Sequence, residues 1–257
     1  MIARFFPCFK GAFGKISTIF LAHQLSNKKP EKTFCGTESR SLRTPSTDTT
    51  KHIATMNHPI RFTTPEEAVK VIKSGDHVHL SSVASVPQIL VRAMTARGEA
   101  GELQHVHIHH LHTEGEALYA VPEMEGIFQL DSFFVGGNVR NITQQGFADY
   151  IPVFLSETQR LYRDGILPCN VAMIQVSTPD RHGYVSLGTS VDATLAAVEC
   201  ADTVIAVVNR HVPRSFGDSF IHTSQIDLFV EDDTPLIEEH FAEPNDLECA
   251  IGRNCAA

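Results

Sequence analysis

The chain has 257 residues, of which 42% are hydrophobic and 20% are charged, a composition typical of a globular protein rather than a disordered chain. Its formal net charge of −9 argues against nucleic-acid binding, which needs a basic surface. No apolar run approaches the roughly 20 residues that a membrane-spanning helix needs, so the sequence predicts neither nucleic acid nor membrane as a partner.

The six cysteines show no CxxC pair and no regular spacing. This pattern is typical of free thiols in a reducing compartment rather than of a secreted disulfide scaffold. We therefore expect a soluble cytoplasmic protein.

Residues 1–55 differ from the rest in charge, with nine Lys or Arg and three acidic residues, whereas the remainder holds 12 basic and 27 acidic residues. The segment has no sustained helical or strand period and reads as unstructured. One explanation is an organelle transit peptide, which would make the protein mitochondrial, although Glu31, Glu38 and Asp48 dilute that signature. The other is non-native upstream sequence, with translation starting at Met56. Both explanations stay open.

The patterned region starts after Met56. Thr64 and Glu67 form a predicted capping box around Pro65, at the start of a helix over Glu66–Lys73 that Gly75 ends. The elements predicted next are a strand at Asp76–Leu80, a helix at Val86–Arg97 closed by Gly98, and strands at Leu103–Leu111 and Phe128–Val135.

The second half repeats this alternation. The predicted elements are a helix at Ser156–Asp164, a strand at Asn170–Val176, a turn at Asp180–Gly183, a helix at Val191–Cys200, and strands at Thr203–Val208 and Ile226–Val230. Alternating strands and helices, with several strands wholly apolar, predict an α/β fold with an open, mostly parallel sheet covered by helices on both faces. Ligands bind such sheets beyond the carboxyl ends of the strands, so the loops after Leu80, Val135, Val176 and Val208 are the places to look for function.

A histidine run occupies residues 104–112. Strand alternation would put His105, His107 and His109 on one face, and zinc accepts imidazole ligands. However, side chains two residues apart on a strand lie about 7 Å apart, and no acidic residue within the run completes or orients such a site. We therefore predict no metal site here, and expect a strand face that is partly exposed or packed on polar neighbours.

Two loops combine glycine with cations. Gly136–Arg140 offers close backbone approach and a guanidinium for a carboxylate or phosphate, but it has neither the dinucleotide nor the P-loop spacing. Asn209–Gly217 joins an amide, cations and glycine after an apolar strand. Ser177 does not lie in a GxSxG motif, which gives no support to a serine hydrolase.

The stretch Ser177–Asp192 (STPDRHGYVSLGTSVD) resembles a signature of the acetyl-CoA hydrolase/transferase family, which includes the 4-hydroxybutyrate and acetate CoA-transferases. Three further stretches fit the same family in the same order: Gly136–Arg140 with Tyr150–Pro152, Val208–Gly217, and Ile251–Arg253. The resemblance runs from about Arg61 to the last residue. One departure is His211, where family members more often have an uncharged residue.

This resemblance implies an N-terminal domain with an open α/β sheet. Family members are longer, and their second domain carries the nucleophilic glutamate and the glycine-rich loops that hold CoA. No acidic residue here lies in a matching motif, so no catalytic residue is assigned. Residues 56–257 are expected to be the N-terminal domain of a CoA-transferase, truncated before the C-terminal catalytic domain and inactive alone. Coenzyme A is implied as a substrate rather than a bound cofactor, and the full-length protein as a homo-oligomer.

The resemblance and the strand ends together suggest a set of substrate-binding candidates, which is Asn209, Pro213, Gly217, Gly137, Asn138 and Arg140, with Ser85 and Pro87 behind them. The alternative is that these loops only build a domain interface. Three functions stay open: a CoA-transferase acting on an acyl-CoA and a small carboxylic acid of the acetate, butyrate or 4-hydroxybutyrate class, an acetyl-CoA hydrolase of the same family, and a non-catalytic fragment.

Overall fold

In the computed structural model, the described residues are 60–238 and 242–256. The predictions for residues 1–55, including Cys8 and Cys35, lie outside this range. Among the described helices, none combines the length and apolarity needed to span a membrane. The described cysteines, which are Cys169, Cys200, Cys249 and Cys255, are free thiols, as predicted.

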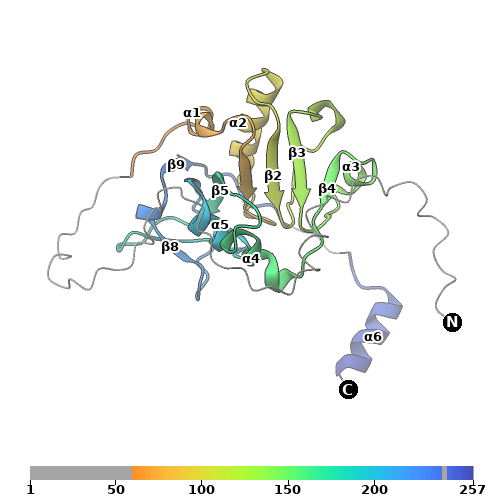
Figure 1. Cartoon of the computed structure of the whole chain (residues 1–257). Coiled ribbons are helices and arrows are strands. Elements are labelled where there is room, and N and C mark those ends of the chain that lie inside the picture. Colours follow the sequence, from red (N-terminus) through yellow and green to blue (C-terminus); the bar gives the residue numbers. More distant parts are fainter. Residues whose placement is uncertain (1–59, 239–241, 257) are drawn as a thin grey trace, which may run out of the picture. The chain divides into compact units, whose positions relative to one another are not determined.

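A seven-stranded sheet forms the centre of the fold (Figure 1), with the strand order β4-β3-β2-β1-β5-β7-β9. Every neighbouring pair in it is parallel, which confirms the predicted fold class. The strands are β1 (His77–Leu80), β2 (Val106–His110), β3 (Phe128–Ser132), β4 (Ala148–Tyr150), β5 (Val171–Val176), β7 (Thr203–Val208) and β9 (Leu228–Glu231). A separate antiparallel pair joins β6 (Tyr184–Ser186) to β8 (Phe220–His222).

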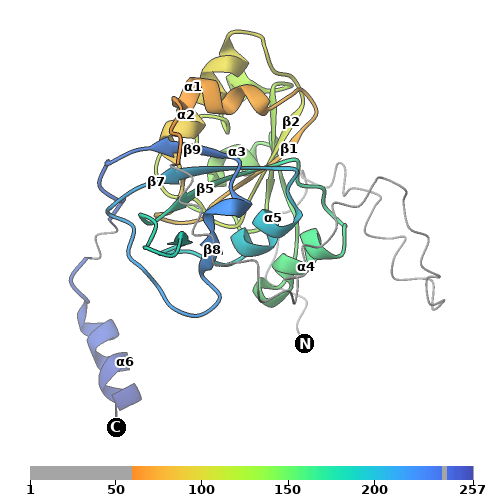
Figure 2. The ribbon, with the colours of Figure 1, turned by 90° about the vertical axis from the view of Figure 1, so that its left-hand side faces the viewer.

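Helices lie on both faces of the sheet, as predicted. Figure 2 shows α1 (Pro65–Ala68) and α2 (Gln88–Glu99) on one side and α4 (Thr158–Arg163) and α5 (Thr194–Cys200) on the other. The remaining helices are α3 (Arg140–Gln144) and α6 (Asp246–Ala256), with 3₁₀ turns at Val69–Val71, Pro122–Met124, Leu155–Glu157 and Thr223–Gln225.

The two faces of the sheet differ in chemistry. The face under α1 and α2 is apolar, and it buries Leu80, Ile108, Leu130, Met173 and Ile205 in one hydrophobic cluster. The strand register places the alternate residues on the other face, where β5 and β7 contribute small or aliphatic side chains. On that same face β1, β2 and β3 instead present histidines and a carboxylate. Because burying unpaired charges is costly, these polar groups need partners among themselves.

Several predicted boundaries were wrong for local reasons. The helix predicted at Glu66–Lys73 is α1 followed by a 3₁₀ turn, although the Thr64 hydroxyl does cap it by accepting from Glu67 N at 3.3 Å. Gly98 does not end α2, which runs to Glu99. A Cβ added at Gly98 would lie 2.6 Å from Cε2 of Phe128, so this glycine lets the helix approach β3 closely. At its other end α2 begins at Gln88, after Pro87, rather than at the predicted Val86.

The strand predicted at Leu103–Leu111 is shorter, because His105 has a positive φ of 53° and ends the extended backbone. His105 therefore does not share a strand face with His107 and His109, which corrects the predicted alternation. The sequence patterns also missed α3, β4, α6 and the β6–β8 pair, whose short or polar segments carry little periodicity.

Candidate functional site

Arg214 joins the loops that follow β5 and β7, which are neighbours in the sheet. Its Nη1 donates to the carbonyl oxygens of Thr178 at 3.0 Å and Tyr184 at 3.2 Å. Its Nη2 lies 3.2 Å from Oδ2 of Asp180. Two of the stretches that carry the family resemblance are therefore one structural unit at the carboxyl edge of the sheet. Sequence reasoning did not select Arg214, although a cation within the Val208–Gly217 stretch was the available signal.

Asp180 forms the predicted turn. Its Oδ1 accepts hydrogen bonds from the backbone N–H of His182 at 2.8 Å and of Tyr184 at 2.9 Å. The hydrogen bond from Tyr184 outweighs partial burial and, with the charge of Arg214, holds the pKa of Asp180 below its ordinary value. The carboxylate therefore stays ionised and available to Arg214 near neutral pH.

Asn209 directly follows β7 and is buried. Its Nδ2 donates to the carbonyl oxygen of Thr234 at 2.8 Å, and its Oδ1 accepts from His211 N at 2.8 Å. The side chain thus ties the loop after β7 to the segment after β9. An amide nitrogen carries two hydrogens, so one N–H remains beyond the bond to Thr234. Pro213 and Gly217, in the same loop, are both exposed.

The loop after β3 holds three more of the predicted residues. Gly137 is exposed and has open space around the position of a Cβ. The Asn138 amide donates to Thr113 Oγ1 and to the carbonyl oxygen of Gly115, both at 3.3 Å, and so fixes this loop against the one after β2. Arg140 is exposed at the first position of α3.

The loop after β1, in the middle of the sheet, buries its three serines but exposes Val83. Ser85 lies 2.6 Å from Thr189 (Oγ to Oγ1), and Pro87 is buried behind it. Ser81 and Ser82 follow β1 directly, and their hydroxyl oxygens are buried without a hydrogen-bond partner in the described part of the chain. Buried hydroxyls without a partner are uncommon because each costs about 1–3 kcal/mol. These two serines are functional candidates that the sequence reasoning passed over, and their place at the end of a central strand was the signal.

The predicted site residues share one edge of the sheet but do not form one cluster. Arg140 follows β3 and Asn209 follows β7, and these strands lie four places apart in the sheet. At about 4.8 Å per strand the separation is about 19 Å. The candidates therefore line an extended edge, with Ser85 and Pro87 near its middle.

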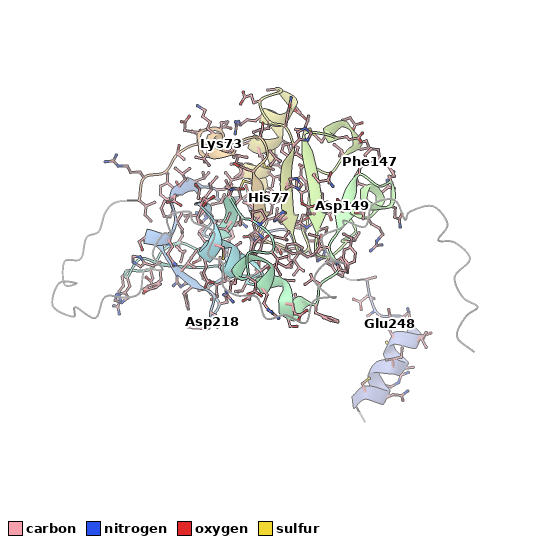
Figure 3. The ribbon with its side chains drawn as sticks, viewed as in Figure 1. Lys73, His77, Phe147, Asp149, Asp218 and Glu248 are labelled. Atoms are coloured by element: carbon pink, nitrogen blue, oxygen red, sulfur yellow. The ribbon has the colours of Figure 1, made fainter. Side chains whose placement is uncertain are left out.

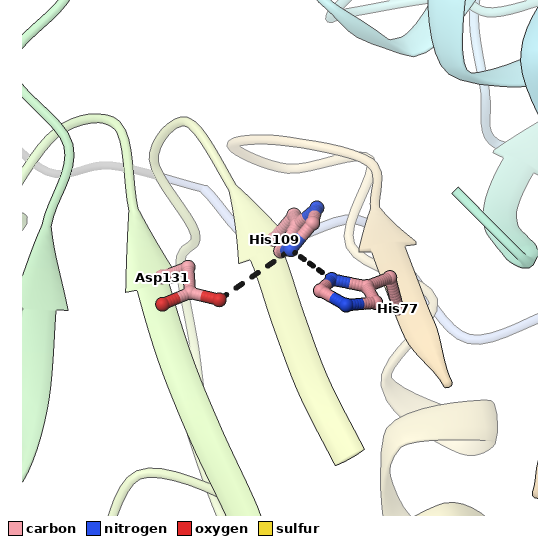
Figure 4. Close-up of side chains that lie close together, drawn as sticks. All are labelled: His77, His109 and Asp131. Atoms are coloured by element: carbon pink, nitrogen blue, oxygen red, sulfur yellow. Dashed lines mark hydrogen bonds and ion pairs between the residues drawn. The ribbon is translucent and has the colours of Figure 1, made fainter. Parts of the chain in front are cut away.

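Histidines from two strands meet a carboxylate from a third on the sheet face opposite α1 and α2 (Figure 4). Nδ1 of His77 in β1 lies 3.0 Å from Nε2 of His109 in β2, which lies 3.4 Å from Oδ2 of Asp131 in β3. His107 Nδ1 lies 2.7 Å from the same Asp131 oxygen. The histidine run itself contains no acidic residue, and its carboxylate partner comes from the next strand, where the parallel register of β2 and β3 pairs His109 with Asp131.

Burial and mutual repulsion set the charges in this cluster. Burial, together with the neighbouring His109 and His107 and against the opposing charge of Asp131, lowers the pKa of His77 to about 4. Burial alone would raise the pKa of Asp131, but hydrogen bonds from His109 and His107 outweigh it and hold that pKa below its ordinary value. His77 is therefore neutral and Asp131 ionised near pH 7.

Comparison with known proteins identifies the family of this chain. Residues 47–238 match the family described as "Acetyl-CoA hydrolase/transferase N-terminal domain". The chain is 40% identical over 197 residues to the 4-hydroxybutyrate coenzyme A transferase of Clostridium kluyveri, covering 77% of this chain and 46% of that protein. It is 34% identical over 187 residues to the butyryl-CoA:acetate CoA-transferase of Anaerostipes caccae, covering 70% and 40%.

A solved structure agrees with the fold. The crystal structure of RipA from Yersinia pestis aligns with a TM-score of 0.68 at 29% identity, covering 72% of this chain and 44% of RipA. The chain thus spans less than half the length of each of these three proteins. The open parallel sheet, the motif-bearing loops at its carboxyl edge and the family match over residues 47–238 show that the chain belongs to the acetyl-CoA hydrolase/transferase family, of which it contains the N-terminal domain.

Proposed function

We propose that the chain is the N-terminal half of a CoA-transferase that moves CoA between an acyl-CoA and a small carboxylate of the acetate, butyrate or 4-hydroxybutyrate class. The names of the relatives in Clostridium kluyveri and Anaerostipes caccae support this substrate class. The observation that carries the proposal is the set of contacts from Arg214 to Thr178 and Asp180. These contacts bring together two stretches of family resemblance at the sheet edge where open α/β folds bind ligands.

The proposed chemistry is covalent catalysis through a glutamate outside this chain. The glutamate carboxylate attacks the acyl-CoA carbonyl and expels CoA thiolate, which leaves an acyl–glutamyl anhydride. The thiolate then attacks the glutamyl carbonyl, releases the acyl carboxylate and forms a glutamyl-CoA thioester. An acceptor carboxylate reverses these steps to form the new acyl-CoA. This route divides one difficult exchange into easier ones, and it needs water to be excluded because water hydrolyses both intermediates.

In this proposal the residues at the edge of the sheet bind and orient substrate. The exposed Arg140 guanidinium pairs with an anionic group of the substrate, and the second N–H of Asn209 donates to a carbonyl oxygen as charge develops on it. The strands that these two residues follow, β3 and β7, lie about 19 Å apart. In this proposal a substrate as long as an acyl-CoA extends along this edge of the sheet.

A hybrid chain tests the proposal. Residues 1–238 are fused to the part of the Clostridium kluyveri relative that follows its matched segment. Transfer of CoA from butyryl-CoA to acetate is measured for the hybrid and for the 257-residue chain alone. We expect transfer by the hybrid and none by the chain alone. Transfer by the chain alone, or a folded hybrid without turnover, would contradict the proposal.

The same assay separates the transferase from a hydrolase. Free thiol is measured with and without acetate. A transferase forms acetyl-CoA and releases little thiol, whereas a hydrolase releases thiol at a rate that does not depend on acetate.

A further inference from the structure

We propose that His77, His109 and Asp131 form a zinc(II)-binding site on the sheet face opposite α1 and α2. The three residues come from three adjacent strands, and the side-chain view places His77 among the central strands (Figure 3). His77 is the first residue of β1, whereas His109 and Asp131 each lie one residue before the carboxyl end of β2 and β3. None of the three belongs to the proposed substrate-binding residues, so the zinc site does not rest on the proposed function.

The distances fit one ion. His77, His109 and Asp131 each offer one ligand atom, and these three atoms all lie within 4.8 Å of one another. Zinc binds imidazole nitrogen and carboxylate oxygen at about 2.0–2.2 Å, and two donors around such a tetrahedral ion stand about 3.3 Å apart. The separations of 3.0 Å between His77 and His109 and 3.4 Å between His109 and Asp131 lie on either side of that value.

The donor set also fits zinc chemically. Two imidazoles and one carboxylate supply three protein ligands, and the fourth tetrahedral position is left for water, as in open zinc sites. Magnesium and calcium prefer oxygen-only ligands, which this cluster does not offer. The donor set therefore favours a transition-metal ion. Among these ions we propose zinc, which binds imidazole and carboxylate ligands and has no redox chemistry.

Hydrogen bonding alone does not satisfy the cluster as fully as a metal does. Nε2 of a neutral histidine carries either a hydrogen or a lone pair. If His109 Nε2 donates to Asp131, it has no lone pair for a hydrogen on His77. If it accepts from His77, it has no hydrogen for Asp131. One zinc ion at the centre accepts a lone pair from all three groups at once.

His107 is placed as a positioning residue. Its Nδ1 lies 2.7 Å from Oδ2 of Asp131, and an orienting hydrogen bond to a ligating carboxylate is the usual support of a metal site. The His107 side chain is 35% exposed and that of Asp131 is 13% exposed, whereas His109 is fully buried. An ion therefore reaches the cluster from the His107 side without unfolding the sheet.

Competition for zinc tests the site. The full chain is stripped with a chelator and titrated with zinc(II) in the presence of a chromophoric zinc chelator. We expect one zinc per chain whose affinity falls more than tenfold in both His77→Gln and Asp131→Asn, and about tenfold in His107→Gln. His211→Gln, an exposed histidine after β7, is the matched control and should bind as the wild type does. Circular dichroism verifies the fold of each variant.

Cobalt(II) keeps the test decisive if a variant does not fold. In the wild-type chain, cobalt should give the intense visible absorption of a tetrahedral nitrogen–oxygen site without a thiolate charge-transfer band. A thiolate band would place the metal on the cysteines and overturn the proposal. Zinc binding by folded His77→Gln and Asp131→Asn at wild-type affinity, or no zinc binding by the wild type, would overturn it equally.

Discussion

Nδ1 of His79 lies 2.9 Å from the hydroxyl oxygen of Tyr162, and both side chains are buried between the sheet and α4. The other ring nitrogen of His79 lies 3.1 Å from Oγ1 of Thr194 in α5. One imidazole therefore links β1 to the two helices that cover this face of the sheet.

Replacing this imidazole should destabilise the fold. His79→Leu leaves the Tyr162 hydroxyl buried without its partner, whereas the Thr194 hydroxyl keeps its hydrogen bond to Oδ1 of Asp192 at 3.3 Å. One buried hydroxyl without a partner costs about 1–3 kcal/mol, and we expect the free energy of unfolding in urea to fall by about that amount. His211→Leu, at an exposed position, should change it by less than about 0.5 kcal/mol. Equal stability of the two variants would show that the His79 contacts contribute nothing.

Arg214→Ala should loosen the junction between the loops after β5 and β7. The variant loses the donors to Thr178 and Tyr184 and the contact with Asp180. We expect amide hydrogen exchange to accelerate over residues 177–186, with a stability loss of about 1–2 kcal/mol. Arg214→Lys keeps the charge but not the planar fork, and should resemble the alanine variant. Arg181→Ala is the control. Faster amide exchange in Arg181→Ala, without faster exchange in Arg214→Ala, would contradict the role given to Arg214.

Gly188→Ala should be far more damaging than Gly137→Ala. Gly188 has a φ of +70°, and a Cβ there would lie 2.2 Å from Cγ1 of Val212. Strain and overpacking together should cost about 3 kcal/mol or more. At Gly137 a Cβ would meet open space. The free energy of unfolding of Gly137→Ala should therefore lie within about 0.5 kcal/mol of the wild-type value. Thermal and urea unfolding measure both, and comparable losses would contradict this account.

Cys169 should resist alkylation in the folded protein. Burial raises the pKa of its thiol from 9.0 to about 12, and only the thiolate reacts with iodoacetamide. At pH 8.5 we expect labelling of the exposed Cys255 and none of Cys169 until urea is added, as measured by peptide mass spectrometry. Rapid labelling of Cys169 without urea would contradict its burial.

The raised pKa of Cys169 also makes the free energy of unfolding depend on pH. Between pH 9 and about 12 the unfolded thiol loses its proton while the folded one keeps it. The contribution of Cys169 to stability is therefore complete below pH 9 and falls as the pH rises through 12. Cys169→Ala should flatten this part of the stability curve.

The parts of the fold predicted best are those with buried apolar strands. Thr203–Val208 is a strand with the predicted bounds, and five of its six residues are buried. A continuous apolar run of this length is typical of a parallel strand covered on both faces. Ala148–Tyr150 was missed because only Ala148 is buried in so short a segment. The strand predicted at Leu103–Leu111 was too long because nothing in the sequence indicates the positive φ of His105.

The site was predictable only at the level of the sheet edge. Which loops follow β5 and β7 is evident from the strand pattern, but the pairing of Arg214 with Thr178 and Tyr184 depends on how those loops fold back. Likewise, the meeting of His109 with His77 and Asp131 requires the strand order, which periodicity along the chain does not contain. Contacts across strands were therefore the part that sequence reasoning could not reach.

The position of β1 between β2 and β5 governs the order in which the sheet closes during synthesis. β2 starts at Val106, soon after β1, whereas β5 starts at Val171, and the contact between His77 N and Asn170 Oδ1 at the β5 side joins residues 93 apart. A nascent chain therefore keeps one edge of β1 unpaired until β5 has left the ribosome. Unpaired strand edges promote aggregation, and long-range parallel pairing is slow. The pairing in the middle of the sheet thus waits for β5, and a chain that stalls before β5 is exposed to misassembly at the open edge of β1.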